Sequence, residues 1–429
     1  MFTAPVAAAA LLSGALLSAC SSQGTTAQSA NSPVTIDFWN TYTGPLETEL
    51  ASIVHDFETT HPNITVKLVY QPYATELQSL QTAVAAKQPP ALAQIEMSGA
   101  GTLVADGALA PVSGLLPSSA AQALKASIIP SIAAANSFQG QLYTVPFGYN
   151  SNVLYYNKDL LAKDGISPQD MPKTWAQLEA DSEQVARDSK GSVYGYAFPA
   201  QASWILEARF WQSGVTLFNP AGTKATFDTA QGVSMFNDYK QLLNTKAAEM
   251  VYTDADLDQL TDLFASGKVA MFEQSSTAVQ SIASEVKFPV GVATFPTMGK
   301  QAYSMGGYDL GIFNNVPQAQ QQAAAEFAQW WSSPAIAAKW TASSNYLSGI
   351  KAVYSTATYQ KWEKANPSGA VAAQQLPYAQ PEPDMAGFTQ IATDLTNAFD
   401  ATMTGKGSAQ SNLSSLASQA NTILAQNPS

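Results

Sequence analysis

Short apolar segments typical of buried strands alternate with amphipathic segments typical of helices from residue 34 onward, and this alternation restricts the possible folds more than any other feature. In the first third of the chain the strand patterns cover residues 34–39, 64–70 and 91–95, and the helix patterns cover residues 45–62, 73–87 and 99–107. Leu46, Leu50, Ile53 and Phe57 recur on one face of the first helix pattern. Three strand–helix units in series predict an open, mainly parallel α/β sheet.

A second series of the same kind follows residue 150. Its strand patterns cover residues 152–157, 193–198, 268–273 and 288–295, and its helix patterns include residues 174–189 and 203–214. Thr174 is suited to the N-cap position of the first of these helices. A chain of 429 residues is long enough for two or three domains. The two series therefore predict two α/β units.

Two apolar runs contain an interruption that bears on how these units are joined. In VPFGYNSNVLYYN, residues 145–157, the interruption is the pair Tyr149 and Asn150; in AYSMGGYDLGIF, residues 302–313, it is Gly306, Gly307 and Tyr308. Either half of the first run alone predicts a buried strand. We interpret the interruptions as places where the chain leaves one packed unit and enters the other.

Polar side chains follow the first three predicted strands at the points where those strands end. Asn40 and Tyr42 follow the first strand, Tyr73 the second and Glu96 the third. Ligands of open α/β sheets bind beyond the carboxyl ends of the strands. Amide, phenol and carboxylate groups at this edge predict a site for a polar, hydroxyl-bearing ligand, although a single loop Tyr or Glu is equally often solvated.

Composition and motifs favour a binding protein over an enzyme. The chain is 46% hydrophobic and 12% charged, as expected of a globular protein, and its formal net charge of −12 without basic clusters argues against a nucleic-acid partner. The sequence has no complete nucleophile, phosphate-loop or dinucleotide motif, so no cofactor is expected. His55 and His61 do not have the spacing of metal ligands. A pair of carboxylates acting as a glycosidase stays open, because acids are numerous.

The N-terminus predicts export and lipid anchoring. Residues 5–19 form an uncharged apolar run of signal-peptide length that ends at Cys20, the only cysteine of the protein. Small residues before a lone cysteine resemble a bacterial lipobox, in which that cysteine is lipidated; an incidental cysteine after an ordinary signal is the alternative. We expect residues 1–20 to be a lipoprotein signal peptide and residues 21–33 a flexible tether. The mature protein is then extracytoplasmic and anchored to the outer face of the cell membrane.

Seven stretches carry a resemblance to a known family. They are IDFWNTYTGPLETEL, FQGQLYTVPFGYNSNVLYYNKDLLAKDGI, PKTWAQLE, FASGKVAMFEQSS, GVATFPT, MGGYDLGIF and NYLSGIKAVY. In this order they resemble the extracellular solute-binding proteins of ABC importers, family 1, which bind maltose-type sugars or glycerol-3-phosphate. The VLYYNKD pattern and the Gly-Gly pair are most similar to the branch that binds glycerol-3-phosphate and glycerophosphodiesters.

The resemblance implies the periplasmic-binding-protein type II fold, with two α/β lobes that close on a solute about hinge crossovers. Lobe one would comprise residues 34–147 and 307–345, and lobe two residues 148–306 and 346–429. The ligand-binding residues implied by position are Asn40, Tyr42, Tyr73, Glu96, Tyr149, Asn150, Trp204, Ser275, Ser276, Gly306, Gly307 and Tyr346. Trp204 would stack on a sugar, or else pack in a core; Ser275 and Ser276 could instead cap a helix.

One departure from the family bears on the solute. Phosphate-binding relatives have an arginine in the C-terminal helical stretch, where this chain has Ala392. A bidentate arginine is a strong phosphate anchor, so its absence favours an uncharged carbohydrate or polyol, with Arg209 as a weak substitute. We expect a monomeric, non-enzymatic receptor that delivers its solute to an ABC permease. The alternatives are a secreted glycosidase or lyase, which needs a second acid beside Glu96, and a structural cell-surface lipoprotein.

Overall fold

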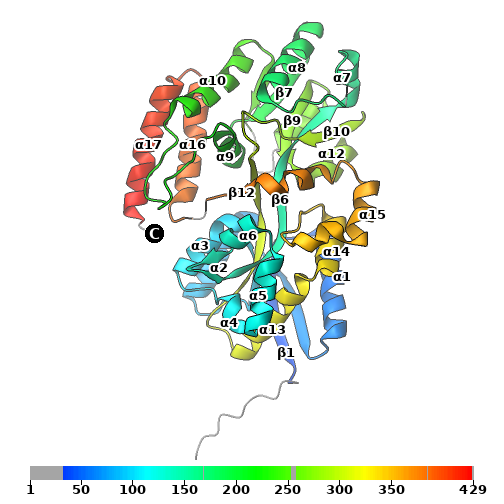
Figure 1. The fold of residues 1–429 in the computed structure, drawn as a ribbon, viewed down its shortest axis with the longest axis vertical. Helices are drawn as coiled ribbons and strands as arrows, with labels where there is room; N and C mark the ends of the chain where they lie inside the picture. The colour runs from blue at the N-terminus through cyan, green and yellow to red at the C-terminus, as the bar shows by residue number, and fades with distance from the viewer. Residues whose placement is uncertain (1–31, 168, 253–257, 384, 428–429) are drawn as a thin grey trace, which may run out of the picture.

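The structure is a computed structural model that describes residues 32–167, 169–252, 258–383 and 385–427 (Figure 1). The predicted signal peptide, Cys20 and nearly all of the predicted tether lie outside the described residues. No helix in the described part of the chain is long and apolar enough to cross a membrane.

One ten-stranded sheet runs through both halves of the molecule. Its order is β2-β1-β3-β11-β6-β9-β7-β8, with β10 added on β6 and β12 added on β11. The pairs among β1, β2 and β3, among β7, β8 and β9, and between β11 and β12 are parallel, whereas β6 and β11 pair antiparallel with each other and with their remaining neighbours. The strands are β1 (Val34–Asn40), β2 (Ile64–Tyr70), β3 (Leu92–Glu96), β6 (Thr144–Asn157), β7 (Tyr194–Pro199), β8 (Ala248–Val251), β9 (Val269–Ser275), β10 (Val290–Thr294), β11 (Tyr303–Ile312) and β12 (Ala379–Pro381).

The two interrupted apolar runs are continuous strands, and β6 passes from one half of the sheet to the other next to Tyr149 and Asn150, where the sequence predicted that the chain changes unit. The first part of β6 pairs with β11 in the lower half of Figure 1, and its last residues, from Asn152, pair with β9 and β10 in the upper half. Polar and glycine residues fit within these strands because each lies at a place where the side chain meets a cavity or a neighbouring backbone. The crossovers are therefore extended strands shared by both halves.

Helices cover both faces of the sheet in each half, which we call lobe one (lower in Figure 1) and lobe two (upper). The helices of lobe one are α1 (Gly44–Thr60), α2 (Glu76–Ala85), α3 (Ala100–Ala105), α4 (Val112–Leu115), α5 (Ser118–Ser127), α6 (Pro130–Ala135), α13 (Gln318–Trp331) and α14 (Pro334–Ser344). The helices of lobe two are α7 (Lys158–Lys163), α8 (Trp175–Asp188), α9 (Ser203–Gln212), α10 (Ala230–Asn244), α11 (Asp258–Ala265), α12 (Val279–Glu285), α16 (Phe388–Met403) and α17 (Ala409–Gln426).

The remaining elements are short or join the lobes. α15 (Ala357–Ala365) packs on α14, and a small hairpin of β4 (Ser137–Phe138) and β5 (Gln141–Leu142) precedes β6. Short 3₁₀ helices are η1 (Tyr73–Thr75), η2 (Met97–Gly99), η3 (Ser276–Ala278), η4 (Lys351–Ser355) and η5 (Val371–Tyr378). The residue boundaries that the resemblance implies for the lobes stay a prediction.

Local sequence signals account for the elements that present the site. Leu50, Ile53 and Phe57 of α1 are completely buried on the face that the helix periodicity predicts. Thr174 is the N-cap of α8, as predicted, and forms a reciprocal capping box with Gln177. α1 follows β1 directly, so the polar residues after Asn40 lie at the carboxyl end of a strand that pairs in parallel with β2 and β3.

Candidate functional site

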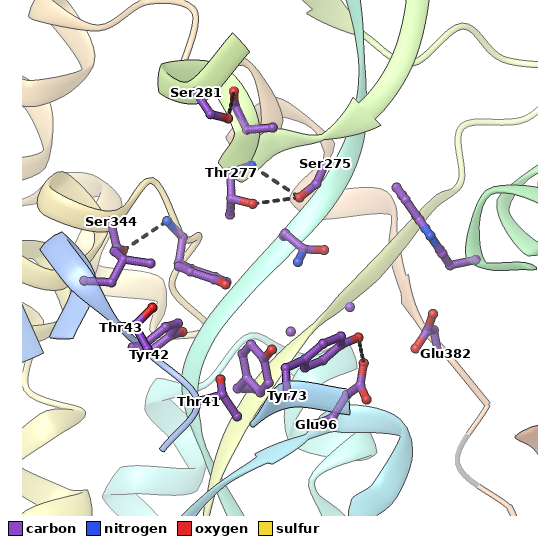
Figure 2. Close-up of a pocket in the computed structure, with 18 of the residues that line it drawn as sticks. Thr41, Tyr42, Thr43, Tyr73, Glu96, Ser275, Thr277, Ser281, Ser344 and Glu382 are labelled. Atoms are coloured by element: carbon purple, nitrogen blue, oxygen red, sulfur yellow. Dashed lines mark hydrogen bonds between the residues drawn. The ribbon is translucent and has the colours of Figure 1, made fainter. Parts of the chain in front are cut away.

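A cavity of about 610 Å³ lies between the lobes, beside the strands that cross from one to the other (Figure 2). Most of its lining comes from strand ends of lobe one, from the crossover strands and from the start of helices in lobe two. Nine residues predicted from the sequence line it: Tyr42, Tyr73, Glu96, Asn150, Trp204, Ser275, Gly306, Gly307 and Tyr346. We call this space the interlobe cavity.

Four tyrosines form the lobe-one side of the interlobe cavity. The ring of Tyr42 lies 5.9 Å from that of Tyr346 and 6.1 Å from that of Tyr308, and Tyr308 lies 6.5 Å from Tyr73, all between centroids. Burial raises the pKa of the Tyr42, Tyr308 and Tyr346 phenols. These phenols therefore stay neutral and can donate as well as accept hydrogen bonds, which suits a hydroxyl-rich ligand.

Glu96 ends β3 within hydrogen-bond reach of this tyrosine group. The Tyr73 hydroxyl donates a hydrogen bond of 3.0 Å to Glu96 Oε1, as Figure 2 shows. Burial raises the pKa of the Glu96 carboxyl, and the Tyr73 hydrogen bond opposes that rise. Tyr73 thus orients the Glu96 carboxyl and favours its ionised form.

Glycines allow β6 and β11 to pass close to each other at the base of the cavity. Gly306 and Gly307 pair with Asn150 and Tyr149, and Gly307 has a φ of +125°. A Cβ atom at Gly307 would lie 2.4 Å from the Gly148 carbonyl oxygen. Only glycine fits there, because its conformation is left-handed and the neighbouring backbone leaves no room for a side chain.

Lobe two contributes Trp204 and the turn that follows β9. Trp204 is partly buried: it lines the cavity and also packs against the large core, so both of its predicted roles apply in part. Ser275 caps η3 by accepting a hydrogen bond of 3.3 Å from the Thr277 N–H, and both hydroxyls face the cavity. The predicted capping role of Ser275 is confirmed.

Three residues of the predicted set do not line the cavity, because each is at least nine-tenths buried and bonded to protein. Asn40 accepts from the Tyr42 N–H (3.1 Å), the Tyr149 hydroxyl donates to Asp309 Oδ1 (2.5 Å), and Ser276 Oγ accepts from the Ser151 N–H (3.3 Å). Strand alternation explains Tyr149, since its neighbour Asn150 on β6 does reach the cavity. Ser276 begins η3, next to Ser275, which does reach the cavity.

The sequence reasoning also missed residues that the structure brings to the cavity. Thr41, Thr43, Thr277 and Tyr308 are chain neighbours of predicted residues and could have been found from them. Asp258 and Glu382 gave no such signal. Glu382 follows β12, a three-residue strand whose pairing with β11 joins segments more than 70 residues apart. The expectation that Glu96 is the one evident acid of the cleft is wrong.

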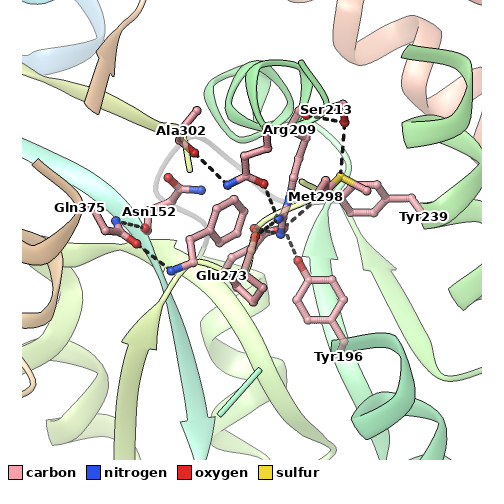
Figure 3. A network of polar contacts seen from close by, with 12 residues as sticks. Asn152, Tyr196, Arg209, Ser213, Tyr239, Glu273, Met298, Ala302 and Gln375 are labelled. Atoms are coloured by element: carbon pink, nitrogen blue, oxygen red, sulfur yellow. Dashed lines mark hydrogen bonds and ion pairs between the residues drawn. The ribbon is translucent and has the colours of Figure 1, made fainter. Parts of the chain in front are cut away.

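The described lining of the interlobe cavity contains no lysine, arginine or histidine. Arg209 does not supply the missing cation, because its side chain is completely buried in lobe two (Figure 3). It lies over the Phe295 ring at 3.5 Å, pairs with Glu273 and donates a hydrogen bond of 3.0 Å to the Tyr239 hydroxyl. Our expectation that Arg209 could substitute as a ligand anchor therefore lacks support from the geometry.

No group of three or more described His, Cys, Asp or Glu side chains is arranged to hold a metal ion. The described lining of the interlobe cavity presents hydroxyls, carboxyl groups, glycine backbone and aromatic faces.

The model of the family described as "Bacterial extracellular solute-binding protein" matches residues 52–367. The chain belongs to this family. Its sequence is 28% identical over 412 residues to "sn-glycerol-3-phosphate-binding periplasmic protein UgpB" of Yersinia pseudotuberculosis, which covers 91% of this chain and 92% of the relative. It is 29% identical over 417 residues to the protein of the same name from Pectobacterium atrosepticum, with 92% of each chain covered.

Solved structures show the same fold. The cyclic alpha-maltosyl-1,6-maltose binding protein from Arthrobacter globiformis superposes with a TM-score of 0.83 at 20% identity, covering 92% of this chain and 100% of that one. UgpB from Mycobacterium tuberculosis, in complex with glycerophosphocholine, gives a TM-score of 0.79 at 19% identity over 92% and 99% of the two chains. The predicted periplasmic-binding-protein fold is confirmed.

Membership of this family makes the protein an extracytoplasmic solute-binding protein of an ABC importer and not an enzyme, as the sequence predicted. Asp258 and Glu382 line the cavity together with Glu96. Family membership nevertheless excludes the glycosidase alternative. The permease of the importer is the partner that the family implies.

Proposed function

We propose that this receptor captures a hydroxyl-rich solute of the saccharide or polyol class in the interlobe cavity, and that it binds glycerol-3-phosphate weakly. The observation that carries the proposal is that the described lining holds the acids Glu96, Asp258 and Glu382 but no cationic side chain that could pair with a phosphate. A phosphate monoester carries close to two negative charges at neutral pH. Like charges at short range in a partly buried site repel, so this lining disfavours the phosphate.

Capture follows from how the cavity is divided between the lobes. The tyrosines and Glu96 come from lobe one, whereas Trp204, Ser275 and Thr277 come from lobe two. A solute that contacts both sets stabilises the closed arrangement over the open one, and the hinges at the crossovers absorb the motion. We place the hinges near Phe147–Asn150, Ser304–Gly307 and Tyr346. The solute contacts that we propose are the nine predicted residues that line the interlobe cavity.

Anchoring completes the proposed function. Lipidation at Cys20 with a tether over residues 21–33 would keep a monomeric receptor on the outer face of the cell membrane, within reach of its permease. The sequence pattern at LSAC supports this, since Cys20 has no other cysteine to pair with.

The test is a thermal-shift panel of saccharides, polyols and glycerol-3-phosphate on the mature chain, followed by calorimetry and small-angle scattering for closure. Glycerol-3-phosphate belongs in the panel because the relatives are named for it. We expect a saccharide or polyol to bind at about micromolar Kd or tighter and to compact the protein. Tight, salt-sensitive binding of glycerol-3-phosphate with no sugar or polyol binding would overturn the proposal.

A further inference from the structure

Two acidic residues lie at the ends of strands that approach each other along one edge of β11: Glu96 is the last residue of β3, and Glu382 directly follows β12. β3 runs antiparallel to β11 and stops with Glu96 opposite Tyr308, while β12 runs parallel to β11 and stops with Pro381 opposite Met305. Glu382 is the next residue, so it continues toward Glu96 beside Gly306. The two pairing positions are three residues of β11 apart, about 10 Å of strand, and Glu382 shortens that gap.

Figure 2 shows both side chains at the same end of the interlobe cavity, near Tyr73. Burial and, after it, the charge of the neighbouring Glu96 raise the pKa of the Glu382 carboxyl to about 8. One carboxylate belongs to the lobe-one sheet, and the other begins the segment that leads to α16 of lobe two. The Glu96 and Glu382 carboxyl groups therefore lie on either side of the boundary between the two lobes, which close on the solute.

A third carboxyl group, that of Glu207, is buried near Glu382. Glu207, on α9 one turn from Trp204, is completely buried, and neither of its carboxylate oxygens accepts a hydrogen bond of ordinary geometry. Burial and the charge of Glu382 raise its pKa, and the nearby Ser203 hydroxyl opposes that rise. A buried, unpartnered carboxylate is costly. The raised pKa favours the neutral form of this buried carboxyl, and Glu382, whose charge contributes to the shift, lines the cavity.

No described lysine or arginine is among the groups that shift the pKa of the Glu96, Glu207 or Glu382 carboxyl. Metal ions are a poor match, because no described cluster of three ligands is arranged to hold one. Trp204 and Tyr73 add aromatic faces to the lining, and aromatic faces attract organic cations.

We propose that the space between Glu96 and Glu382 is the subsite for a cationic nitrogen of the solute, an ammonium group on a hydroxyl-rich molecule. The inference rests on the proposed function and narrows its solute class. An ammonium that hydrogen-bonds two carboxylates at about 2.8 Å each holds their oxygens about 4.5 Å apart, which the converging strand ends permit.

Two matched pairs of probes test the subsite by calorimetry on the mature chain. Chitosan disaccharide against cellobiose tests a primary ammonium, and glycerophosphocholine against glycerophosphoglycerol tests a quaternary one. In at least one pair we expect the cationic member to bind about tenfold or more tighter than its partner. Its binding also releases protons, so the measured enthalpy depends on the ionisation enthalpy of the buffer.

Glu382→Gln is the decisive variant, since it keeps the shape and removes the charge. It should weaken the cationic probe about tenfold and leave the matched uncharged probe within about twofold. Glu326→Gln, an exposed acid on α13 outside the cavity, changes net charge equally and should change neither.

Two outcomes overturn the subsite and leave the proposed function standing. In the first, the cationic and the uncharged member bind equally well in both pairs. In the second, an uncharged solute of the panel binds while neither cationic probe does. A panel in which no solute binds at all overturns the proposed function itself. An unaltered cationic preference in Glu382→Gln also overturns the subsite.

Discussion

Arg209 Nη2 lies 3.3 Å from Glu273 Oε2, and both side chains are completely excluded from solvent. The pair joins α9, which carries Trp204, to β9, which ends at Ser275. Tyr196 and Tyr239 also donate to Glu273, and Arg209 reaches the Pro296 carbonyl (Figure 3). Coulombic attraction from Glu273 and the two phenols holds the pKa of Arg209 high against burial. The network therefore fixes the two lobe-two elements that face the solute.

Removing Arg209 tests this positioning role. Arg209→Met leaves Glu273 buried without its counter-charge, and we expect a loss of about 3–5 kcal/mol in the free energy of unfolding, measured by denaturant titration. Arg187→Met is the matched control, because Arg187 is exposed and its pair with Asp188 should contribute less than about 1 kcal/mol. Unchanged stability of Arg209→Met together with lost solute binding would instead make Arg209 a direct anchor.

Trp204 should contribute more to affinity than to stability. Trp204→Ala removes an aromatic face from the cavity, and we expect the Kd for the identified solute to rise about ten- to a hundredfold. Trp331, which is 1% exposed, provides the contrast: its replacement by Ala should cost about 3–5 kcal/mol of unfolding free energy. If both variants lose equal stability and Trp204→Ala still binds normally when folded, Trp204 is a core residue only.

Tyr73 should act on the solute through Glu96. Tyr73→Phe removes the 3.0 Å hydrogen bond to the carboxylate, and a bond of this kind is typically worth about 0.5–1.5 kcal/mol, or about two- to twelvefold in Kd. The same change should raise the pKa of Glu96, observable by carboxyl-labelled NMR titration. Tyr70→Phe, at the exposed end of β2, is the control and should leave both quantities unchanged.

Buried acids should make the ligand-free protein less stable as pH rises. Burial and Glu96 raise the pKa of Glu76 to about 8 from 4.5. The unfolded chain loses this proton first, so the folded state binds more protons between these two values and unfolding becomes easier across that window. The melting temperature should fall from about pH 5 to about pH 9, and Glu76→Gln should flatten the curve. Glu326→Gln should not, and a melting temperature that rises with pH would contradict the assignment.

Cys20 should decide where the protein resides in the cell. Cys20→Ser removes the only thiol that can be lipidated, so we expect release into the medium or an unprocessed precursor. Fractionation and mass spectrometry of the N-terminus distinguish the two outcomes. A Cys20→Ser protein that stays processed and bound to the membrane contradicts the lipobox interpretation.

The helices and strands that present the site could be predicted from the sequence, because each depends mainly on residues close together in the chain. The periodicity of residues 45–62 predicted α1, the run at 64–70 predicted β2, and Thr174 predicted the start of α8. The strand-end rule placed Tyr42, Tyr73 and Glu96 at one edge of a sheet, and they do line one cavity. Polar groups at the ends of parallel strands share an edge whatever the detailed packing.

Long-range pairing decided the rest. Residues 145–157 read as two strands with a break, because the sequence does not reveal that β11 and β9 pair with successive halves of one strand. Glu382 lines the cavity because of the register in which β12 pairs with β11. Arg209 lies outside the cavity, where its guanidinium group pairs with Glu273 and Tyr239 in the core of lobe two. Periodicity reports which face of an element is apolar, whereas the partner of a buried charge depends on residues far away in sequence. Tertiary structure therefore determined the charge of the site, while the sequence determined its elements.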